Sequence, residues 1–295
     1  MTMTFSDIPK SASGIMKSGM EVIMPHDVRP SPLAGRWYPG ETSRLQAEIV
    51  RHLGTLAKTS YQQIRGLVAP HAGLMFSGPV GAKGFRHLAD QQYDIVVVIG
   101  PSHYPVSHPL VTTGHDAYET PLGKIPVAQA ILKQLGEKIA LHPIRNDPEH
   151  SIEMTLPFLQ NLLGEFQLVP LVMRDQSYPA SRQLAEALHH ILQDKNVLYV
   201  ASSDLSHFYP QQVANEMDKR VLEKISDYNA ENVTRLQDGG IVYACGYGAI
   251  STVMLVTRQQ GTKIASQEGY GTSGDITGDY SSVVGYGSVV FHDVR

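Results

Sequence analysis

Three segments of the chain each end an apolar run in residues that bind metals or transfer protons. They are VAPHAG, IGPSHY and ASSDLSH, which supply His71, His103, Asp204 and His207. Neutral imidazoles bind Fe, Cu, Ni or Zn, and histidine also titrates near neutral pH. A single histidine at a strand end is commonly a structural group that bonds a carbonyl. Three similar strand ends in one chain instead favour a shared site for metal binding or acid–base chemistry.

The only cysteine of the chain is a further candidate ligand. Cys245 lies in VYACGYGAIS, where an apolar run meets two glycines and a helix is expected to begin. With two histidines, either Cys245 or Asp204 would supply the anionic ligand of a metal site that keeps positions open for substrate. A helix start beside the thiol would lower the pKa of Cys245. The structural alternative is a small buried core residue.

The segment NDPEHSIEMTLPFLQ holds more titratable groups. Asp147 before a proline predicts a helix start, with His150 and Glu153 one turn apart. Both side chains could bind a metal, orient another ligand or lie on an exposed face. Glu149 in the first turn is expected to be structural. Pro157 is expected to kink or end this helix.

Apolar and amphipathic segments alternate along the chain, a pattern that builds a parallel sheet with crossover helices. In such sheets the loops after the carboxyl ends of the strands form the ligand crevice, so the three segments can converge. The Gly- and Ser-rich C-terminal region, 261–294, predicts two antiparallel strands. Strands are predicted over 64–70, 93–103, 167–173 and 196–204. Helices are predicted over 43–58, 78–90 and 181–193, and Ser43 is expected to cap the first of them.

Composition excludes several classes of protein. The 295 residues carry a net charge of −4 with both signs scattered, so we expect no nucleic-acid binding. No apolar run is long enough to span a membrane, and one cysteine allows no internal disulfide, which favours the cytoplasm. Residues 1–27 lack periodicity and are expected to be a flexible extension or leader. One domain is expected over 28–295.

The motifs RWYPG, APHAGLMFSG, GPSHY, DPEHSIEMTLPFLQ, SSDLSHF and ACGYGAI occur in this order. With them the chain resembles the Memo family. The resemblance implies a single α/β domain with a mixed, largely parallel central sheet, similar to the class III extradiol dioxygenases, which open catechol rings with Fe(II). It implies that His71 and His103 are metal ligands and that Cys245 replaces a carboxylate ligand. It also implies that His207 is the acid/base, with Asp204 in the same pocket.

Two functions stay open at this point. In the first, an oxygen-dependent enzyme binds a small aromatic diol, with Fe(II) as the expected metal. Cu and Zn are alternatives, because a thiolate is a softer ligand than a carboxylate. In the second, a non-catalytic module holds a metal or a peptide in the same cleft, lined by Trp37, His150 and Glu153. The resemblance further implies association with a radical-SAM protein.

Overall fold

The β-branched residues from Ile95 to Ile99 lie at the centre of the main sheet, in a strand whose residues are all buried. This strand, β3 (Ile95–Pro101), has parallel neighbours on both sides, β8 (Gln167–Met173) and β9 (Val197–Ser202). β9 in turn pairs with parallel β2 (Gln62–Ala69). Helices cover both faces of these strands, which explains why their sequences are continuous apolar runs.

The structure is a computed structural model that describes residues 27–55, 59, 61–237 and 243–293. Most of the predicted N-terminal extension, 1–26, lies outside the described residues. Asp27 is described, and its carboxylate pairs with Nδ1 of His115 at 2.7 Å and with Arg145. These contacts tie Asp27 to the loops around β7. Within these described ranges, no helix has the length and apolar character needed to cross a membrane.

Antiparallel strands extend the parallel centre at both edges. On one side β12 (Val283–Asp293) pairs with β2, and the hairpin partner β11 (Ile264–Thr272) and the short β10 (His207–Tyr209) pair with β12. On the other side β4 (Leu110–Thr113) is antiparallel to β8, and β7 (His142–Ile144) is parallel to β4. The predicted mixed sheet with a parallel centre and antiparallel C-terminal strands is confirmed.

A second, three-stranded sheet lies beside the main one and contains the first strand of the domain. Its order is β1 (Val28–Arg29), β5 (Ala117–Thr120) and β6 (Gly123–Pro126). The pairing of β1 with β5 brings residue 29 close to segments that follow it by more than 100 positions, which matters for the site described below.

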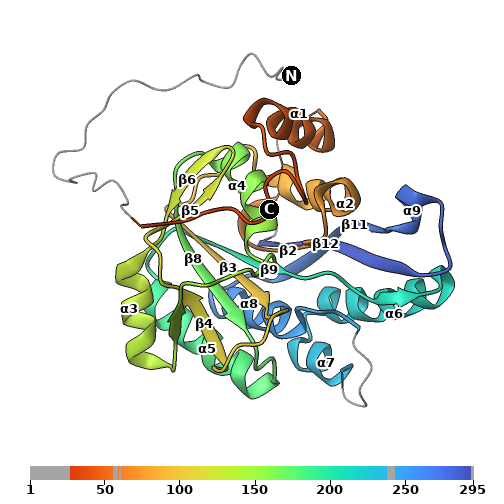
Figure 1. Ribbon diagram of the computed structural model, residues 1–295. Helices are drawn as coiled ribbons and strands as arrows, with labels where there is room; N and C mark the ends of the chain where they lie inside the picture. The colour runs from red at the N-terminus through yellow and green to blue at the C-terminus, as the bar shows by residue number, and fades with distance from the viewer. Residues whose placement is uncertain (1–26, 56–58, 60, 238–242, 294–295) are drawn as a thin grey trace.

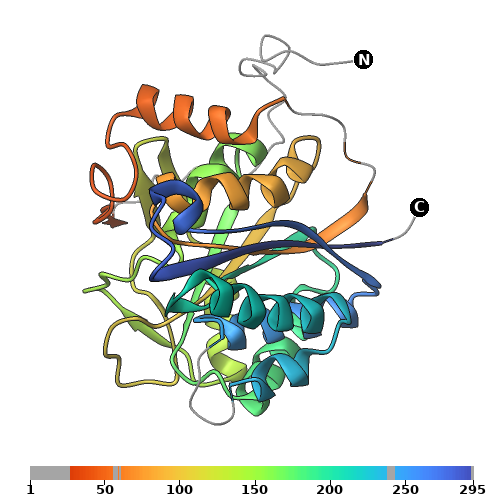
Figure 2. The same ribbon diagram turned by 90° about the vertical axis from the view of Figure 1, so that its right-hand side faces the viewer.

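Helices lie on both faces of the main sheet, as Figure 1 and Figure 2 show. Helices α1, α2 and α4 pack together on one face, and α5, α6, α7 and α8 lie on the other, with α3 against α5. Their bounds are α1 Thr42–Leu53, α2 Leu74–Phe85, α3 Gln129–Lys138, α4 Leu156–Leu163, α5 Tyr178–Leu192, α6 Gln211–Ser226, α7 Ala230–Arg235 and α8 Tyr247–Gln259; the short α9, Gly274–Thr277, joins β11 to β12.

Several predicted helix boundaries are wrong. α1 ends at Leu53 and not at residue 58, α2 begins at Leu74 and not at residue 78, and α5 begins at Tyr178 and not at residue 181. Ser43 does not cap α1, because Glu41 occupies the N-cap position and Ser43 lies inside the helix. No helix begins at Asp147; residues 147–152 form an irregular loop, a short 3-10 helix follows over Glu153–Thr155, and α4 starts at Leu156. Pro157 lies in the first turn of α4, where its missing N–H costs no hydrogen bond, and so begins the helix instead of ending it.

Candidate metal centre

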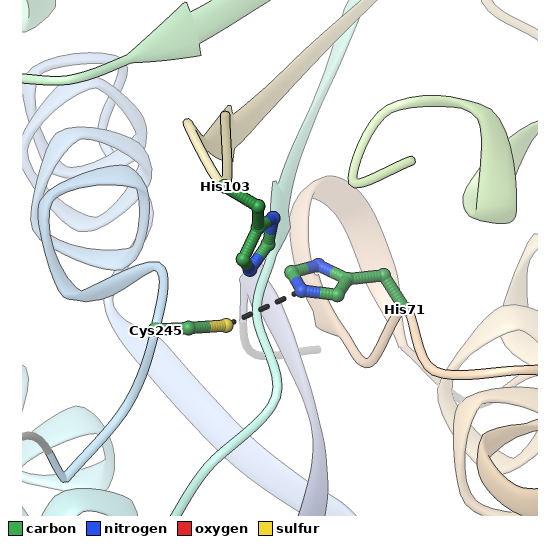
Figure 3. Close-up of side chains that lie close together, drawn as sticks. All are labelled: His71, His103 and Cys245. Carbon is green, nitrogen blue, oxygen red and sulfur yellow. Dashed lines mark hydrogen bonds between the residues drawn. The ribbon is translucent and has the colours of Figure 1, made fainter. Parts of the chain in front are cut away.

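The side chains of His71, His103 and Cys245 converge from three separate loops (Figure 3). His71 follows β2 and His103 follows β3, while Cys245 precedes α8. One potential ligand atom from each residue lies within 4.8 Å of the other two. The Sγ of Cys245 is 3.2 Å from Nε2 of His71, and the two imidazole rings stand nearly perpendicular with centroids 5.1 Å apart. These three residues form the candidate metal centre.

The hydrogen bonds of His71 fix which ring nitrogen is free. Its Nδ1 lies 2.8 Å from Oγ of Ser202, and that hydroxyl donates its own proton to the carbonyl of Ser151. Ser202 must therefore accept from the Nδ1–H, which leaves the lone pair on Nε2 facing Cys245. Burial and the neighbouring imidazoles of His103 and His150 hold the pKa of His71 well below its usual range. His71 is thus neutral, as a metal ligand must be.

His103 is oriented by a carboxylate. Its Nδ1 lies 2.9 Å from Oε1 of Glu149, whose carboxylate also accepts the backbone N–H groups of His103, His150 and Ser151. Burial raises the pKa of Glu149, but the bonds from the ring and backbone of His103 outweigh it and lower that pKa to about 2. Because Glu149 is ionised, Nδ1 of His103 is the donor and Nε2 is free for a metal.

The loop that carries Cys245 is fixed by close contacts with its neighbours. The amide of Gln176 spans the loop, donating to the carbonyl of Cys245 at 2.8 Å and accepting from the N–H of Gly248 at 2.9 Å. Gly246 lies so close to the end of β9 that a Cβ there would be 2.5 Å from the carbonyl oxygen of Ser202. This approach requires glycine and holds the thiol against the strand end.

The thiol of Cys245 is protonated in the absence of a metal. α8 begins at Tyr247, as predicted, but burial and the nearby carboxylate of Asp204 raise the pKa of Cys245 instead of lowering it. The N–H of Asp204 lies 3.2 Å from Sγ and the hydroxyl of Ser203 lies 3.8 Å away. The Ser203 hydroxyl donates its proton to the carbonyl of Asp204 at 2.7 Å, so the N–H of Asp204 is the group that can donate to a thiolate once a metal has displaced the thiol proton.

Asp204 supports His71 and does not orient His207. Its Oδ1 accepts the backbone N–H of His71 at 2.7 Å and of Ala72 at 3.3 Å, and no hydrogen bond joins it to His207, both residues being in the described part of the chain. The two hydrogen bonds lower the pKa of Asp204, but burial has the larger effect and raises that pKa to about 7. Asp204 therefore fixes the backbone turn that delivers His71.

His207 lies at the start of β10, close enough to the centre to interact electrostatically with both His71 and His103. Burial lowers the pKa of His207, with a smaller opposing effect from a hydrogen bond to the backbone of Leu205. The next residue, Phe208, has a left-handed φ of 64°, where the register of β10 on β12 shifts. Such irregularities redirect side chains near functional sites.

His150 and Trp37 lie on one side of the centre. The ring of His150 stacks on His103 at 4.2 Å, meets His71 edge-on at 5.3 Å, and has the half-buried indole of Trp37 at 4.5 Å. Burial and the neighbouring His103 lower the pKa of His150 to about 4, so the ring is neutral. His150 and Trp37 thus supply an aromatic wall beside the candidate ligands.

A family model described as "Memo-like protein" matches residues 29–290. The chain belongs to the Memo family. Relatives described as MEMO1 family proteins include one from Nitrosopumilus maritimus, 31% identical over 90% of this chain and 99% of its own, and one from Methanococcoides burtonii, 35% identical over 89% and 99%. A solved structure of an uncharacterized Escherichia coli K12 protein aligns with a TM-score of 0.49 and 15% identity, covering 77% of this chain and 99% of that one.

Glu153 lies beneath the centre of this Memo-family protein and not in the cleft. Its carboxylate is fully buried and accepts from Arg29 at 2.6 Å, Tyr38 at 2.6 Å and Ser31 at 2.5 Å. This corrects the prediction that Glu153 lines the cleft. The i, i+3 spacing to His150 assumed a helix, whereas the chain before Glu153 is an irregular loop.

Arg29 is the most important residue that sequence reasoning missed. Its guanidinium, 2% exposed, binds the carboxylates of Asp147 and Glu153 and the carbonyl of Glu149. Arg29 thus holds both ends of the 147–153 loop, which presents Glu149 to His103. Arg29 lies seven residues before the motif RWYPG (36–40), and no local feature separates it from other arginines in the sequence. Ser202 begins the motif SSDLSHF, but nothing in that motif pairs it with His71, and Gln176 lies in none of the motifs.

Proposed function

We propose that this Memo-family protein binds one transition-metal ion through Nε2 of His71, Nε2 of His103 and Sγ of Cys245, and uses it to oxidise a small vicinal diol with O2. One observation carries the proposal. The three atoms converge while Nδ1 of each imidazole is occupied by a separate acceptor. Fe(II) is the proposed metal, and Cu and Zn are alternatives for the same set of nitrogen and sulfur donors.

The donor set fits a metal in both distance and chemistry. Metal bonds of about 2.0 Å to nitrogen and about 2.3 Å to sulfur, at angles of about 90–110°, place the two ligand atoms about 3.1–3.6 Å apart. The observed separation of Sγ of Cys245 from Nε2 of His71 is 3.2 Å. Three protein ligands leave coordination positions for a substrate.

Bound Fe(II) would supply the redox chemistry that couples O2 to a chelated diol. The protein's own contribution to the reaction is proton transfer and orientation. His207 is half-buried and its lowered pKa leaves the imidazole neutral at pH 7, so it can accept a proton from a diol hydroxyl. Trp37 and His150 provide flat faces against which an aromatic ring can pack.

The test is anaerobic loading with Fe(II), followed by oxygen-uptake measurements with a panel of catechols. We expect wild-type turnover, loss of turnover in His207→Ala with iron still bound, and loss of iron in His71→Ala and Cys245→Ser. The exposed His190 on α5 gives a matched control, and His190→Ala should keep both iron and turnover. Retention of full metal content in both ligand variants would contradict the proposed site.

The thiol favours a second function, a non-catalytic metal- or peptide-binding module in the same cleft. A thiol beside bound oxygen is liable to oxidise, which works against sustained dioxygenase turnover. Full iron occupancy without turnover on any diol would support this alternative. The association with a radical-SAM protein stays a prediction.

A further inference from the structure

Asp218 is a fully buried acidic residue that has no part in the metal site described above. It lies on α6, which packs against β11 and β12 (Figure 1). Its Oδ1 accepts the N–H of Ser206 at 2.8 Å, and its Oδ2 accepts the hydroxyl of Tyr270 on β11 at 2.8 Å. Burial raises the pKa of Asp218, while the hydrogen bonds from Ser206 and Tyr270 lower it. Because burying a carboxyl group costs free energy, its place in the interior depends on these two bonds.

The strand beside Asp218 leaves room for the carboxylate at a glycine. An ideal Cβ on Gly285 of β12 would overlap the carboxylate of Asp218. Gly285 also binds the chain that leads to His207: its carbonyl accepts the N–H of Leu205 at 2.8 Å, and its N–H donates to the carbonyl of Ser206 at 2.9 Å. Residues 205–206 are therefore held between β12 and Asp218.

The imidazole of His207 is bonded to this same piece of backbone. Burial lowers the pKa of His207, and a hydrogen bond to the backbone of Leu205 opposes that change. A bond that favours the protonated imidazole runs from a ring N–H to an acceptor, and the N–H of Leu205 is already donated to Gly285. The acceptor is therefore the carbonyl of Leu205.

The peptide group between Leu205 and Ser206 thus joins Asp218 to His207. Its N–H donates to the carboxylate of Asp218, and its carbonyl accepts from the imidazole of His207. Hydrogen bonds in such a chain polarise one another, so the bond to Asp218 makes the carbonyl of the same peptide a stronger acceptor. Asp218 therefore fixes the direction of this peptide group and strengthens its bond to the ring.

The backbone that follows His207 is irregular and gives the ring little support. β10 is only 3 residues long, and its register on β12 shifts between His207 and Tyr209. Phe208 between them has a left-handed φ of 64° and a side chain that is 75% exposed. The regular anchor of His207 is therefore the segment before it, which Asp218 holds.

We propose that Asp218 is a positioning residue for His207, acting through the 205–206 peptide group to keep the proton on one ring nitrogen and leave the other nitrogen as the proton acceptor. The inference rests on the proposed function, in which His207 takes a proton from the substrate. A neutral imidazole can accept a proton only at the nitrogen that carries none, so a base needs one fixed tautomer. Asp218 touches no substrate and acts only through the peptide.

The test is nitrogen-15 NMR of the full-length, histidine-labelled protein with one equivalent of Zn(II), under conditions where the imidazole of His207 is neutral. His207→Ala identifies the ring signals by their loss. The wild type should show one dominant tautomer of His207, and Asp218→Ala should populate both. Asp218→Asn keeps an oxygen acceptor of the same size and should restore the wild-type tautomer.

The kinetic readout uses the Fe(II)-loaded protein with catechol. General-base catalysis contributes about 10²–10⁴-fold to a rate, so loss of orientation alone should lower kcat of Asp218→Ala by about tenfold. KM and iron content should stay at the wild-type values, because Asp218 contacts neither the metal ligands nor the substrate. A purely structural role would lower stability without this separation of kcat from KM.

Asp227→Ala is the matched control, because it removes an exposed carboxylate at the C-terminal end of the same helix. It should change neither the tautomer of His207 nor kcat. Asp218→Leu removes the acceptor while filling its volume, and it replaces Asp218→Ala if the smaller side chain prevents folding. Both tautomers in comparable amounts in the wild type, or the wild-type tautomer in a folded Asp218→Ala or Asp218→Leu protein, would overturn the inference.

The NMR and kinetic readouts separate the two proposals. If Asp218→Ala turns over catechol with the wild-type kcat and keeps the wild-type tautomer of His207, the inference about Asp218 is wrong and the proposed function stands. If Asp218→Ala mixes the tautomers but the wild type turns over no diol, Asp218 positions His207 as inferred and the proposed function fails.

Discussion

His71 and His103 are oriented by acceptors of different strength. Nδ1 of His71 faces the neutral hydroxyl of Ser202, whereas Nδ1 of His103 faces the ionised carboxylate of Glu149. Hydrogen bonds to charged groups are roughly twice as strong as neutral ones, and a carboxylate also raises the basicity of the imidazole that it holds. His103 is therefore the stronger nitrogen donor, and its ligation depends most on Glu149.

We expect Glu149→Gln to weaken metal binding by about 10- to 100-fold, because the amide keeps the size of the side chain and loses the charge that orients His103. Competition with a chromophoric chelator for Zn(II) measures the change. Glu186→Gln, an exposed position on α5, is the matched control and should bind Zn(II) as the wild type does. Wild-type affinity in Glu149→Gln would show that this carboxylate does not position His103.

Metal binding should release a proton from Cys245. Burial and Asp204 raise the pKa of Cys245, so the thiol is protonated at pH 7, and the metal must displace that proton. Zn(II) affinity should therefore rise about tenfold per pH unit between about pH 7 and 8.5. Chelator competition at three pH values checks this slope. In Cys245→Ser the Zn(II) affinity should no longer rise with pH in this way. A wild-type affinity that does not change with pH would contradict thiolate ligation.

The candidate ligands were predictable from the sequence, and their orientation was not. His71, His103 and Cys245 stand in short motifs next to apolar runs, where residue type and position both point to a site. Ser202 and Glu149 act through hydrogen bonds between residues 131 and 46 positions apart. Only the folded chain defines such pairs, so no local pattern marks them.

At the scale of elements, the centre depends on how closely the loop before α8 approaches β9. Gly246 makes that approach feasible, since its Cα lies against the carbonyl of Ser202 and its N–H donates to Ser203 at 2.8 Å. Movement of this loop would carry Cys245 away from His71. The distance between Sγ and Nε2 is thus determined by packing between two elements.

Gly246→Ala should lower both stability and Zn(II) affinity, because its Cβ would overlap the end of β9. Gly136→Ala is the control, since Gly136 lies in α3 with nothing within 4 Å of its ideal Cβ. There alanine should stabilise the protein by about 0.5–1 kcal/mol through helix propensity. Thermal unfolding and chelator competition measure both effects. Unchanged metal affinity in Gly246→Ala would contradict the role of this approach.

Strands were easier to predict than the loops between them. β3 and β9 are continuous apolar runs. Because both faces of these strands are buried, few other secondary structures would suit their sequences. The 147–152 loop contains the local signals of a helix start, but buried bonds from Arg29 to Asp147 and to the carbonyl of Glu149 hold it in an irregular form. Tertiary contacts overrode local propensity at that loop.

At the scale of the whole molecule, Arg29 joins the small sheet to the metal centre. It lies in β1, and its charge is matched by Asp147 and Glu153, all three being buried. Removing one member of such a buried ion pair lowers the free energy of unfolding strongly, because the remaining charges stay buried without a partner. The fold and the position of Glu149 therefore depend on the same residue.

Arg29→Met should lower the free energy of unfolding by about 3–5 kcal/mol. Arg235→Met removes an exposed arginine, 65% accessible and paired with Glu231 on α7, and should cost no more than about 1 kcal/mol. Chemical denaturation of both variants measures the difference. A similar small loss in both would mean that the buried network contributes little to stability.

The most direct test of the central claim is X-ray absorption spectroscopy of the wild type and of Cys245→Ser, each loaded with one equivalent of Zn(II). The account predicts one sulfur ligand at about 2.3 Å and two imidazole nitrogens at about 2.0–2.1 Å, with the sulfur signal absent in Cys245→Ser. A first shell of oxygen and nitrogen alone, identical in the wild type and in Cys245→Ser, would contradict it.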